Sequence, residues 1–175
     1  LDVWEAHGAM LVSRLSRFKL RADVSLALTD LHVSAGWAEA QRADRGVAAP
    51  DPRLPAAGWR AISEHAEPSD RYAAYEAHRI ALGLPEPVDC KAEQTLLLEA
   101  NFDWLHGVSW TKGCYMGQEL TARTHYRGLL RRRLVPVRSA TPLPPFGTTI
   151  TCDGKDVGEL RSVADKAGLA FLRRD

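Results

Sequence analysis

The stretch KGCYMGQE, residues 112–119, places a lone cysteine between two glycines. Gly113 and Gly117 permit a positive φ or a close approach of the backbone, because glycine has no Cβ. A loop built on them can be tight and can still leave the thiol of Cys114 accessible. The stretch therefore predicts an exposed, chemically usable cysteine.

A helix is expected directly after this loop, from Gln118 to a stop at Gly128. The N-terminus of a helix carries the positive end of its dipole, and Lys112 adds a second positive charge beside the thiol. Both effects favour the thiolate of Cys114, which is the form that attacks electrophiles or binds metal. The alternative is a buried structural cysteine, since free cysteine is among the most buried residue types.

Arginine is concentrated in residues 123–138, where no acidic residue occurs. Arg123 and Arg127 are four positions apart, so on a helix they share a face. They could bind a carboxylate or phosphate ligand, or an acidic partner. Alternatively the run is only a solvated face. Nucleic acid is not an expected partner, because no aromatic interleaving pattern or known binding motif accompanies the run.

The N-terminal half of the chain predicts helices and strands of an α+β domain. Asp2 and Glu5 resemble a capping box and predict the start of a helix, whose apolar residues recur at helical spacing: Trp4, Leu11, Leu15 and Phe18. Strict alternation predicts a half-buried strand over residues 20–28, and a second strand is expected at residues 32–37. Residues 38–58 lack a clear period and are interpreted as loop.

A further helix is expected from a cap at Ser69 to about Leu82, with Tyr72 and Tyr75 toward its buried side. Gly83 and the proline that follows should stop this helix. Residues 85–91 are interpreted as a linker.

Short strands separated by turns are predicted for the last forty or so residues. Residues 134–137 form one, in which Pro136 implies an edge position. Residues 149–152 and the segment from Val157 onward flank an Asp-Gly turn typical of a hairpin, and residues 168–172 form the last strand. Together they predict a small antiparallel β-barrel.

The overall composition narrows the class of protein. A chain of 175 residues with 45% hydrophobic and 26% charged residues can bury a real core. The net charge of +1 gives no general attraction to nucleic acid or membranes, and no long apolar run predicts a membrane span. Three widely spaced cysteines suit a reducing compartment better than a disulfide framework.

The stretch of residues 112–119 resembles the signature K-G-C-Y-x-G-Q-E of the YgfZ-type family, folate-binding-like proteins that help to mature iron–sulfur enzymes. The resemblance covers most of the chain and is nearest to the mitochondrial branch. It extends over residues 51–55, 58–60, 75–85, 98–101, 107–111, 120–128 and 131–137.

This resemblance implies the fold of the aminomethyltransferase of the glycine cleavage system, a GcvT/YgfZ-like α+β fold. Residues 1–133 would form an α+β, folate-binding-like domain, and residues 134–175 a small C-terminal antiparallel β-barrel. The N-terminal part of the fold, which should supply one wall of a folate-sized pocket, is expected to be missing from this chain.

The resemblance also implies roles for individual residues. Cys114 is expected to be the functional thiol and the metal ligand of the protein. Tyr75 and Glu99 fall where relatives form a pocket for tetrahydrofolate. Arg123 and Arg127 are further candidates for folate or anion binding. The signature residues expected around the thiol are Lys112, Gly113, Tyr115, Gly117, Gln118 and Glu119.

The implied function is maturation of iron–sulfur proteins, late in the assembly of [4Fe–4S] clusters. Cys114 would help to hold or transfer a [2Fe–2S] or [4Fe–4S] cluster shared with an A-type scaffold protein. One thiol cannot ligate a cluster alone, so the scaffold or glutathione would supply the other ligands. The implied location is the mitochondrial matrix after removal of a transit peptide, or else the bacterial cytoplasm. The alternative is a folate-dependent, aminomethyltransferase-like enzyme.

Overall fold

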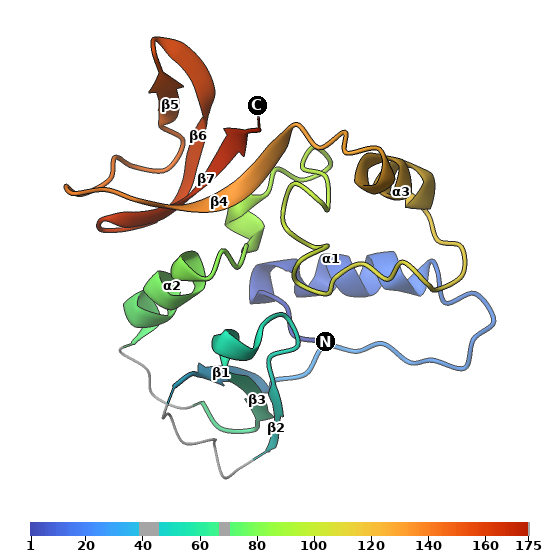
Figure 1. Ribbon diagram of the computed structural model, residues 1–175. Helices are drawn as coiled ribbons and strands as arrows, with labels where there is room; N and C mark the ends of the chain where they lie inside the picture. Colours follow the sequence, from blue (N-terminus) through green and yellow to red (C-terminus); the bar gives the residue numbers. More distant parts are fainter. Residues whose placement is uncertain (39–45, 67–70, 175) are drawn as a thin grey trace.

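The computed structural model describes residues 1–38, 46–66 and 71–174. It has an α+β fold with two antiparallel sheets, and helix α2 (Tyr72–Ala81) lies between them (Figure 1). Among the described residues, no helix is both long and apolar enough to cross a membrane.

The first sheet contains strands β1 (His32–Gly36), β3 (Trp59–Ser63) and β2 (Val47–Pro50), in that spatial order. Its central strand β3 pairs with both neighbours, so that Ala61 lies opposite Ser34 on one side and Ala48 on the other. Ala61 is fully buried, and its small side chain suits this crowded position. The short 3₁₀ helix η1 (Pro55–Ala57) precedes β3.

Helix α1 (Glu5–Ser16) forms as predicted, but Trp4 is its N-cap and no side chain caps it, so the expected capping box of Asp2 and Glu5 is absent. Its only buried residue is Gly8, where a Cβ atom would come within 2.9 Å of the Leu28 side chain. Trp4 and Phe18, at the two ends of this segment, are exposed instead. The half-buried Leu11, Val12 and Leu15 lie on the same face as Gly8, so the helix packs through the middle of its apolar stripe and not through its two ends.

The C-terminal sheet has the order β4-β7-β6-β5, with every neighbouring pair antiparallel. Its strands are β4 (Arg132–Arg138), β5 (Thr149–Cys152), β6 (Lys155–Ala164) and β7 (Ala167–Arg173). Pro136 lies on the edge strand β4, and Asp153-Gly154 turns the β5–β6 hairpin, as predicted. Leu134, Leu169 and Phe171 from this sheet pack with Ile80 of α2 into one core cluster.

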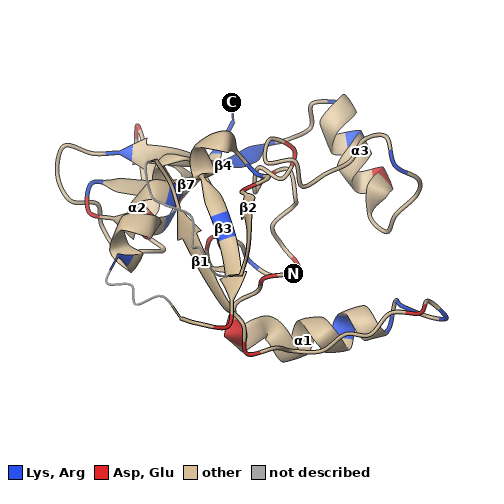
Figure 2. Ribbon diagram, turned by 90° about the horizontal axis from the view of Figure 1, so that it is seen from below, with Lys and Arg blue, Asp and Glu red and all other residues tan. Residues whose placement is uncertain are grey.

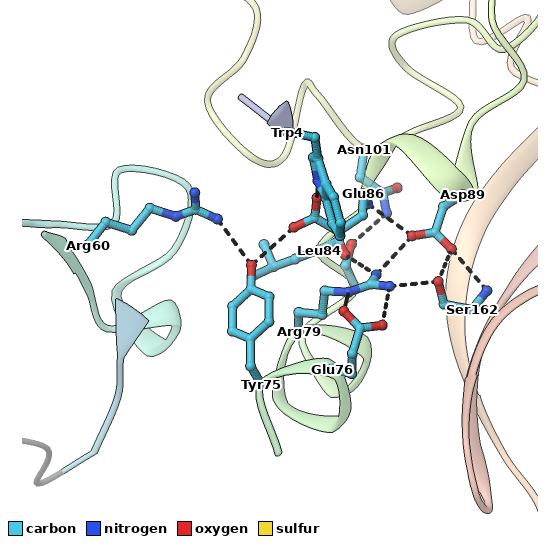
Figure 3. A network of polar contacts seen from close by, with 11 residues as sticks. Trp4, Arg60, Tyr75, Glu76, Arg79, Leu84, Glu86, Asp89, Asn101 and Ser162 are labelled. Atoms are coloured by element: carbon cyan, nitrogen blue, oxygen red, sulfur yellow. Dashed lines mark hydrogen bonds and ion pairs between the residues drawn. The ribbon is translucent and has the colours of Figure 1, made fainter. Parts of the chain in front are cut away.

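A buried polar network around an ion pair joins α2 to the C-terminal sheet (Figure 3). Nη1 of Arg79 lies 2.8 Å from Oδ2 of Asp89, and the two side chains are 1% and 0% exposed. The hydroxyl of Ser162, on β6, accepts from Arg79 at 2.7 Å and donates to Asp89 at 2.6 Å. Because one network contains residues of α2, the 3₁₀ helix η2 (Pro87–Asp89) and β6, it fixes their relative positions.

Several sequence-based expectations for the N-terminal half were wrong. No strand forms over residues 20–28, most of which are exposed; alternation alone does not create a strand when no neighbouring strand pairs with it. The loop expected at 38–58 contains β2 and η1 in its described part, whereas residues 39–45 lie outside the described residues. The linker expected at 85–91 contains η2 and the buried Asp89.

The expectations for α2 had mixed outcomes. Gly83 ends the helix with a φ of +71°, as predicted. Tyr72 was expected on the buried side but is 54% exposed, because it lies in the first turn beyond the reach of the core. The predicted cap at Ser69 lies outside the described residues. The proposed domain boundary between 133 and 134 stays a prediction.

Candidate functional site

The KGCYMGQE loop leads directly into helix α3 (Gln118–Tyr126), as the sequence predicts. Gly117 caps the helix in the left-handed conformation, with a φ of +84°. Its carbonyl accepts from the backbone N–H of Thr121 at 3.1 Å and from the Thr121 hydroxyl at 3.0 Å. An L-residue at position 117 would be strained, so this glycine is needed for the turn. Gly113 has no positive φ and no crowding within 4 Å.

Cys114 is exposed, and its loop and α3 stand apart from both sheets (Figures 1 and 2). The interpretation of this residue as a buried structural cysteine was therefore wrong. Cys152 is also exposed, on β5, whereas Cys90 is half-buried. Burial raises the pKa of the Cys90 thiol, and the neighbouring Asp89 carboxylate raises it further. Cys90 is consequently a poor source of thiolate.

Residues on either side of Cys114 in the sequence form two aromatic contacts. Nζ of Lys112 lies 4.8 Å from the centre of the Tyr115 ring, close enough for a cation–π contact. The Trp110 ring stacks on His125 of α3, with 4.0 Å between ring centres. The stacking supports the exposed loop on the helix. No spacing rule connects Trp110 with His125, so the sequence alone did not indicate this contact.

The arginine run separates into residues with different roles. Arg123 pairs with Glu119 one turn earlier on α3, and both side chains are exposed. Arg127, the C-cap of α3, is exposed. Figure 2 shows basic positions on α3 and on β4. The expectation that these two arginines bind an anion is not tested by the geometry.

Arg133 belongs neither to a solvated face nor to a ligand site. Its side chain is 5% exposed, and its guanidinium makes two hydrogen bonds of 2.9 Å to the carboxylate of Asp103. The centre of the Trp104 ring lies 3.7 Å from Cζ of Arg133. Although burial alone would raise the pKa of Asp103, the Arg133 guanidinium holds that pKa below its usual value. Arg133 therefore anchors Asp103 and Trp104, in the segment that precedes the KGCYMGQE loop, to strand β4.

Tyr75 lies in a polar network at the first sheet (Figure 3). Its hydroxyl accepts from Arg60 at 3.1 Å and donates to Glu86 at 3.0 Å. Burial raises the pKa of the Tyr75 hydroxyl, and the Glu86 carboxylate raises it further. The second Glu86 oxygen accepts from the indole N–H of Trp4 at 2.8 Å. All of these groups are therefore satisfied within the chain.

Glu99 lies elsewhere, in the lining of a cavity against the C-terminal sheet. One of its carboxylate oxygens accepts from the backbone N–H of Leu96 at 3.0 Å. Among the described residues, neither Tyr75 nor Cys114 lines this cavity. Within the signature, Lys112 contacts Tyr115, whereas Tyr75 contacts Arg60 and Glu86 and Glu99 lines the cavity.

No group of three or more histidine, cysteine or acidic residues that could hold a metal ion occurs within the described parts of the chain.

The C-terminal sheet belongs to a segment that matches a known domain family. Residues 131–175 match the family described as "CAF17, C-terminal beta-barrel domain". The α+β fold thus carries a β-barrel domain of this class at its C-terminal end.

The full chain is similar to curated proteins of one kind. It is 43% identical over 136 residues to the human "Iron-sulfur cluster assembly factor IBA57, mitochondrial", an alignment that covers 70% of this chain and 38% of the relative. The homologue of Mycosarcoma maydis is 41% identical over 161 residues, covering 82% of this chain and 40% of the relative. The homologue of Coccidioides immitis is 33% identical over 223 residues, covering 99% and 52%.

The chain belongs to the IBA57 family of CAF17/YgfZ-like proteins, which confirms the resemblance seen in the KGCYMGQE stretch. It spans between 38% and 52% of the length of the three relatives described above.

Proposed function

We propose that this chain is part of an iron–sulfur cluster assembly factor that acts late in [4Fe–4S] assembly and works through the thiolate of Cys114. The observation that carries the proposal is the exposure of Cys114 in a loop that stands apart from the folded core. Membership in the IBA57 family supports it, because the relatives are named as assembly factors. We propose that the protein acts as a non-enzymatic factor and that its fold is GcvT/YgfZ-like.

In this role the cluster is cargo, handed over by ligand exchange. The Sγ lone pair of Cys114 forms a bond to iron while a bond between iron and a scaffold thiolate breaks. The proton of the Cys114 thiol passes to solvent, and the released scaffold thiolate takes up a proton. Iron and sulfur keep their oxidation states, so the step needs no oxidant or reductant.

A partner must supply the remaining ligands. Iron–sulfur clusters are normally held by four thiolates, and the described part of the chain presents Cys114 without another thiol beside it. We therefore propose an A-type scaffold protein as the partner, with glutathione as a further source of thiolate. The mitochondrial names of the relatives support action in the mitochondrial matrix.

Visible circular dichroism of a mixture with a cluster-loaded A-type scaffold tests this proposal. The spectrum of the scaffold's cluster is expected to change on addition of the wild-type protein, because one iron ligand is exchanged, and to stay unchanged with Cys114→Ser. A spectral change that persists in Cys114→Ser would contradict ligation by this thiol. Titration with tetrahydrofolate, with an aminomethyl donor present, examines the folate-dependent alternative, which predicts turnover that survives loss of Cys114.

A further inference from the structure

A cavity of about 300 Å³ lies against one face of the C-terminal sheet, where residues 91–99 pass over it. This volume is at the lower end of the range for small-molecule sites. Its lining is rich in cations and includes Lys91, Arg132, Thr149, Arg161, Phe171 and Arg173. Cys114 does not contribute to it, so the cavity is independent of the proposed role of that thiol.

The strand register brings two of these arginines together. Arg132 on the edge strand β4 is directly opposite Arg173 on β7. Like charges in this position destabilise a sheet. No salt bridge to either side chain occurs among the described residues. Because side chains alternate along a strand, Phe171 lies on the same face as Arg173. The two arginines thus share a face with a residue of the core.

Arg161, on β6, adds a third guanidinium to the cavity, and this one is buried. Its side chain is 4% exposed, with the rings of Phe146 and Phe171 each centred 5.7 Å from the guanidinium carbon. Nη1 lies 3.0 Å from a Glu159 oxygen, but Nε is buried and has no hydrogen-bond partner among the described residues. An unmade bond of a buried charged donor is costly.

The four basic side chains of the cavity outnumber its three carboxylates, which belong to Glu99, Asp156 and Glu159. Glu159 is shared, because its second carboxylate oxygen lies 3.2 Å from Nζ of Lys91. Asp156 accepts from the backbone N–H of Gly158 at 2.9 Å, and Glu99 accepts from that of Leu96 at 3.0 Å. Because no salt bridge to Arg132 or Arg173 occurs in the described part of the chain, their guanidinium donors are available for a ligand.

We propose that this cavity binds a small oxyanion, a carboxylate or phosphate group, through Arg132, Arg173 and Arg161. Planar guanidinium groups match both kinds of oxyanion with paired hydrogen bonds. A bound oxyanion offsets the repulsion between Arg132 and Arg173. The buried Arg161 guanidinium, in the lining of the cavity, also attracts the anion. The threonine hydroxyl of Thr149 is a further donor in the lining.

Isothermal titration calorimetry with the whole protein tests this site, with inorganic phosphate and glutarate as probes at constant ionic strength. We expect saturable binding of at least one of the two, and the tighter ligand identifies the oxyanion as phosphate or carboxylate. The variants Arg132→Gln and Arg173→Gln should each weaken binding by about tenfold or more, because each removes charge-assisted hydrogen bonds.

Arg138→Gln is the matched control. Arg138 is exposed on the same strand as Arg132, lies opposite Ala167 and is outside the cavity lining. Its replacement should leave the dissociation constant unchanged.

Without an anion, Arg173→Gln should unfold at the same temperature as the wild type or higher, since one of two repelling charges is gone. Absence of saturable binding, or equal weakening by Arg138→Gln, would overturn the proposal.

Discussion

Replacing Asp89 by alanine is expected to lower the free energy of unfolding by about 3–5 kcal/mol, because it removes one of the two carboxylates that pair with the buried Arg79 guanidinium. Asp89 is 0% exposed and bonds to Nη1 of Arg79 at 2.8 Å. It also accepts from the backbone N–H and the hydroxyl of Ser162, at 3.0 and 2.6 Å. A loss of this size is a large part of the stability of an ordinary domain.

The electrostatics of Arg79 explain why the loss should be large. Burial alone would lower its pKa, but the hydrogen bond to Glu76 and the charge of Asp89 raise that pKa above its ordinary value. Without Asp89, Arg79 stays charged in a buried place, and β6 loses its bonds to η2. The C-terminal sheet should therefore loosen from α2 together with the loss of stability.

Urea unfolding followed by tryptophan fluorescence measures this effect. Asp89→Asn keeps the shape and one oxygen acceptor, so it should cost less than Asp89→Ala. Arg123→Gln breaks the exposed pair with Glu119 on α3 and should change the free energy of unfolding by less than about 0.5 kcal/mol. The structural account of this network fails if Asp89→Ala is as stable as Arg123→Gln.

Replacing Cys114 by serine should abolish transfer of a cluster to an apo-enzyme that needs [4Fe–4S], with little change in stability. The proposed transfer depends on a thiolate, and a serine hydroxyl does not ionise at neutral pH. The side chain is exposed in a loop outside both sheets, so no packing is lost. Surface substitutions of this kind are usually within about 0.5 kcal/mol of the wild type.

Cys152→Ser is the control for that experiment. Cys152 is also a free, exposed cysteine, but it lies on β5 of the C-terminal sheet. Recovery of enzyme activity, in the presence of a cluster-loaded A-type scaffold, should be as fast with this variant as with the wild type. Equal activity of the Cys114→Ser protein would show that transfer does not use this thiol.

The C-terminal half of the fold was predictable because its signals are local. The Asp153-Gly154 turn determines a hairpin within a few residues, and Pro136 excludes a central strand wherever its neighbours lie. The start of α3 was equally local, since Gly117 supplies the left-handed cap. Each of these features follows from backbone chemistry that does not depend on a distant partner.

Features that depend on distant partners were not predictable. Residues 20–28 alternate like a strand, yet a strand needs a neighbour, and sequence alone does not say that none pairs there. Asp89 looked like part of a linker because its partners, Arg79 and Ser162, lie 10 and 73 positions away. The opposed pair of Arg132 and Arg173 becomes visible only through the strand register.

The local features of the candidate site were predictable, whereas those that need distant partners were not. Exposure of Cys114 followed from its glycine-flanked loop, and the resemblance of residues 112–119 indicated the family. The roles of Tyr75 and Glu99 depend on a pocket that the described residues do not form between them. Those two assignments stay predictions.

Alkylation of the cysteines by iodoacetamide, followed by mass spectrometry of each peptide, tests the central claim most directly. In the protein alone, Cys114 and Cys152 should both react, because both are exposed. With a cluster-loaded A-type scaffold, Cys114 should become protected while Cys152 continues to react, and the scaffold without its cluster should protect neither. Unchanged alkylation of Cys114 with the loaded scaffold, or equal protection by the empty scaffold, would contradict ligation of the cluster by this thiol.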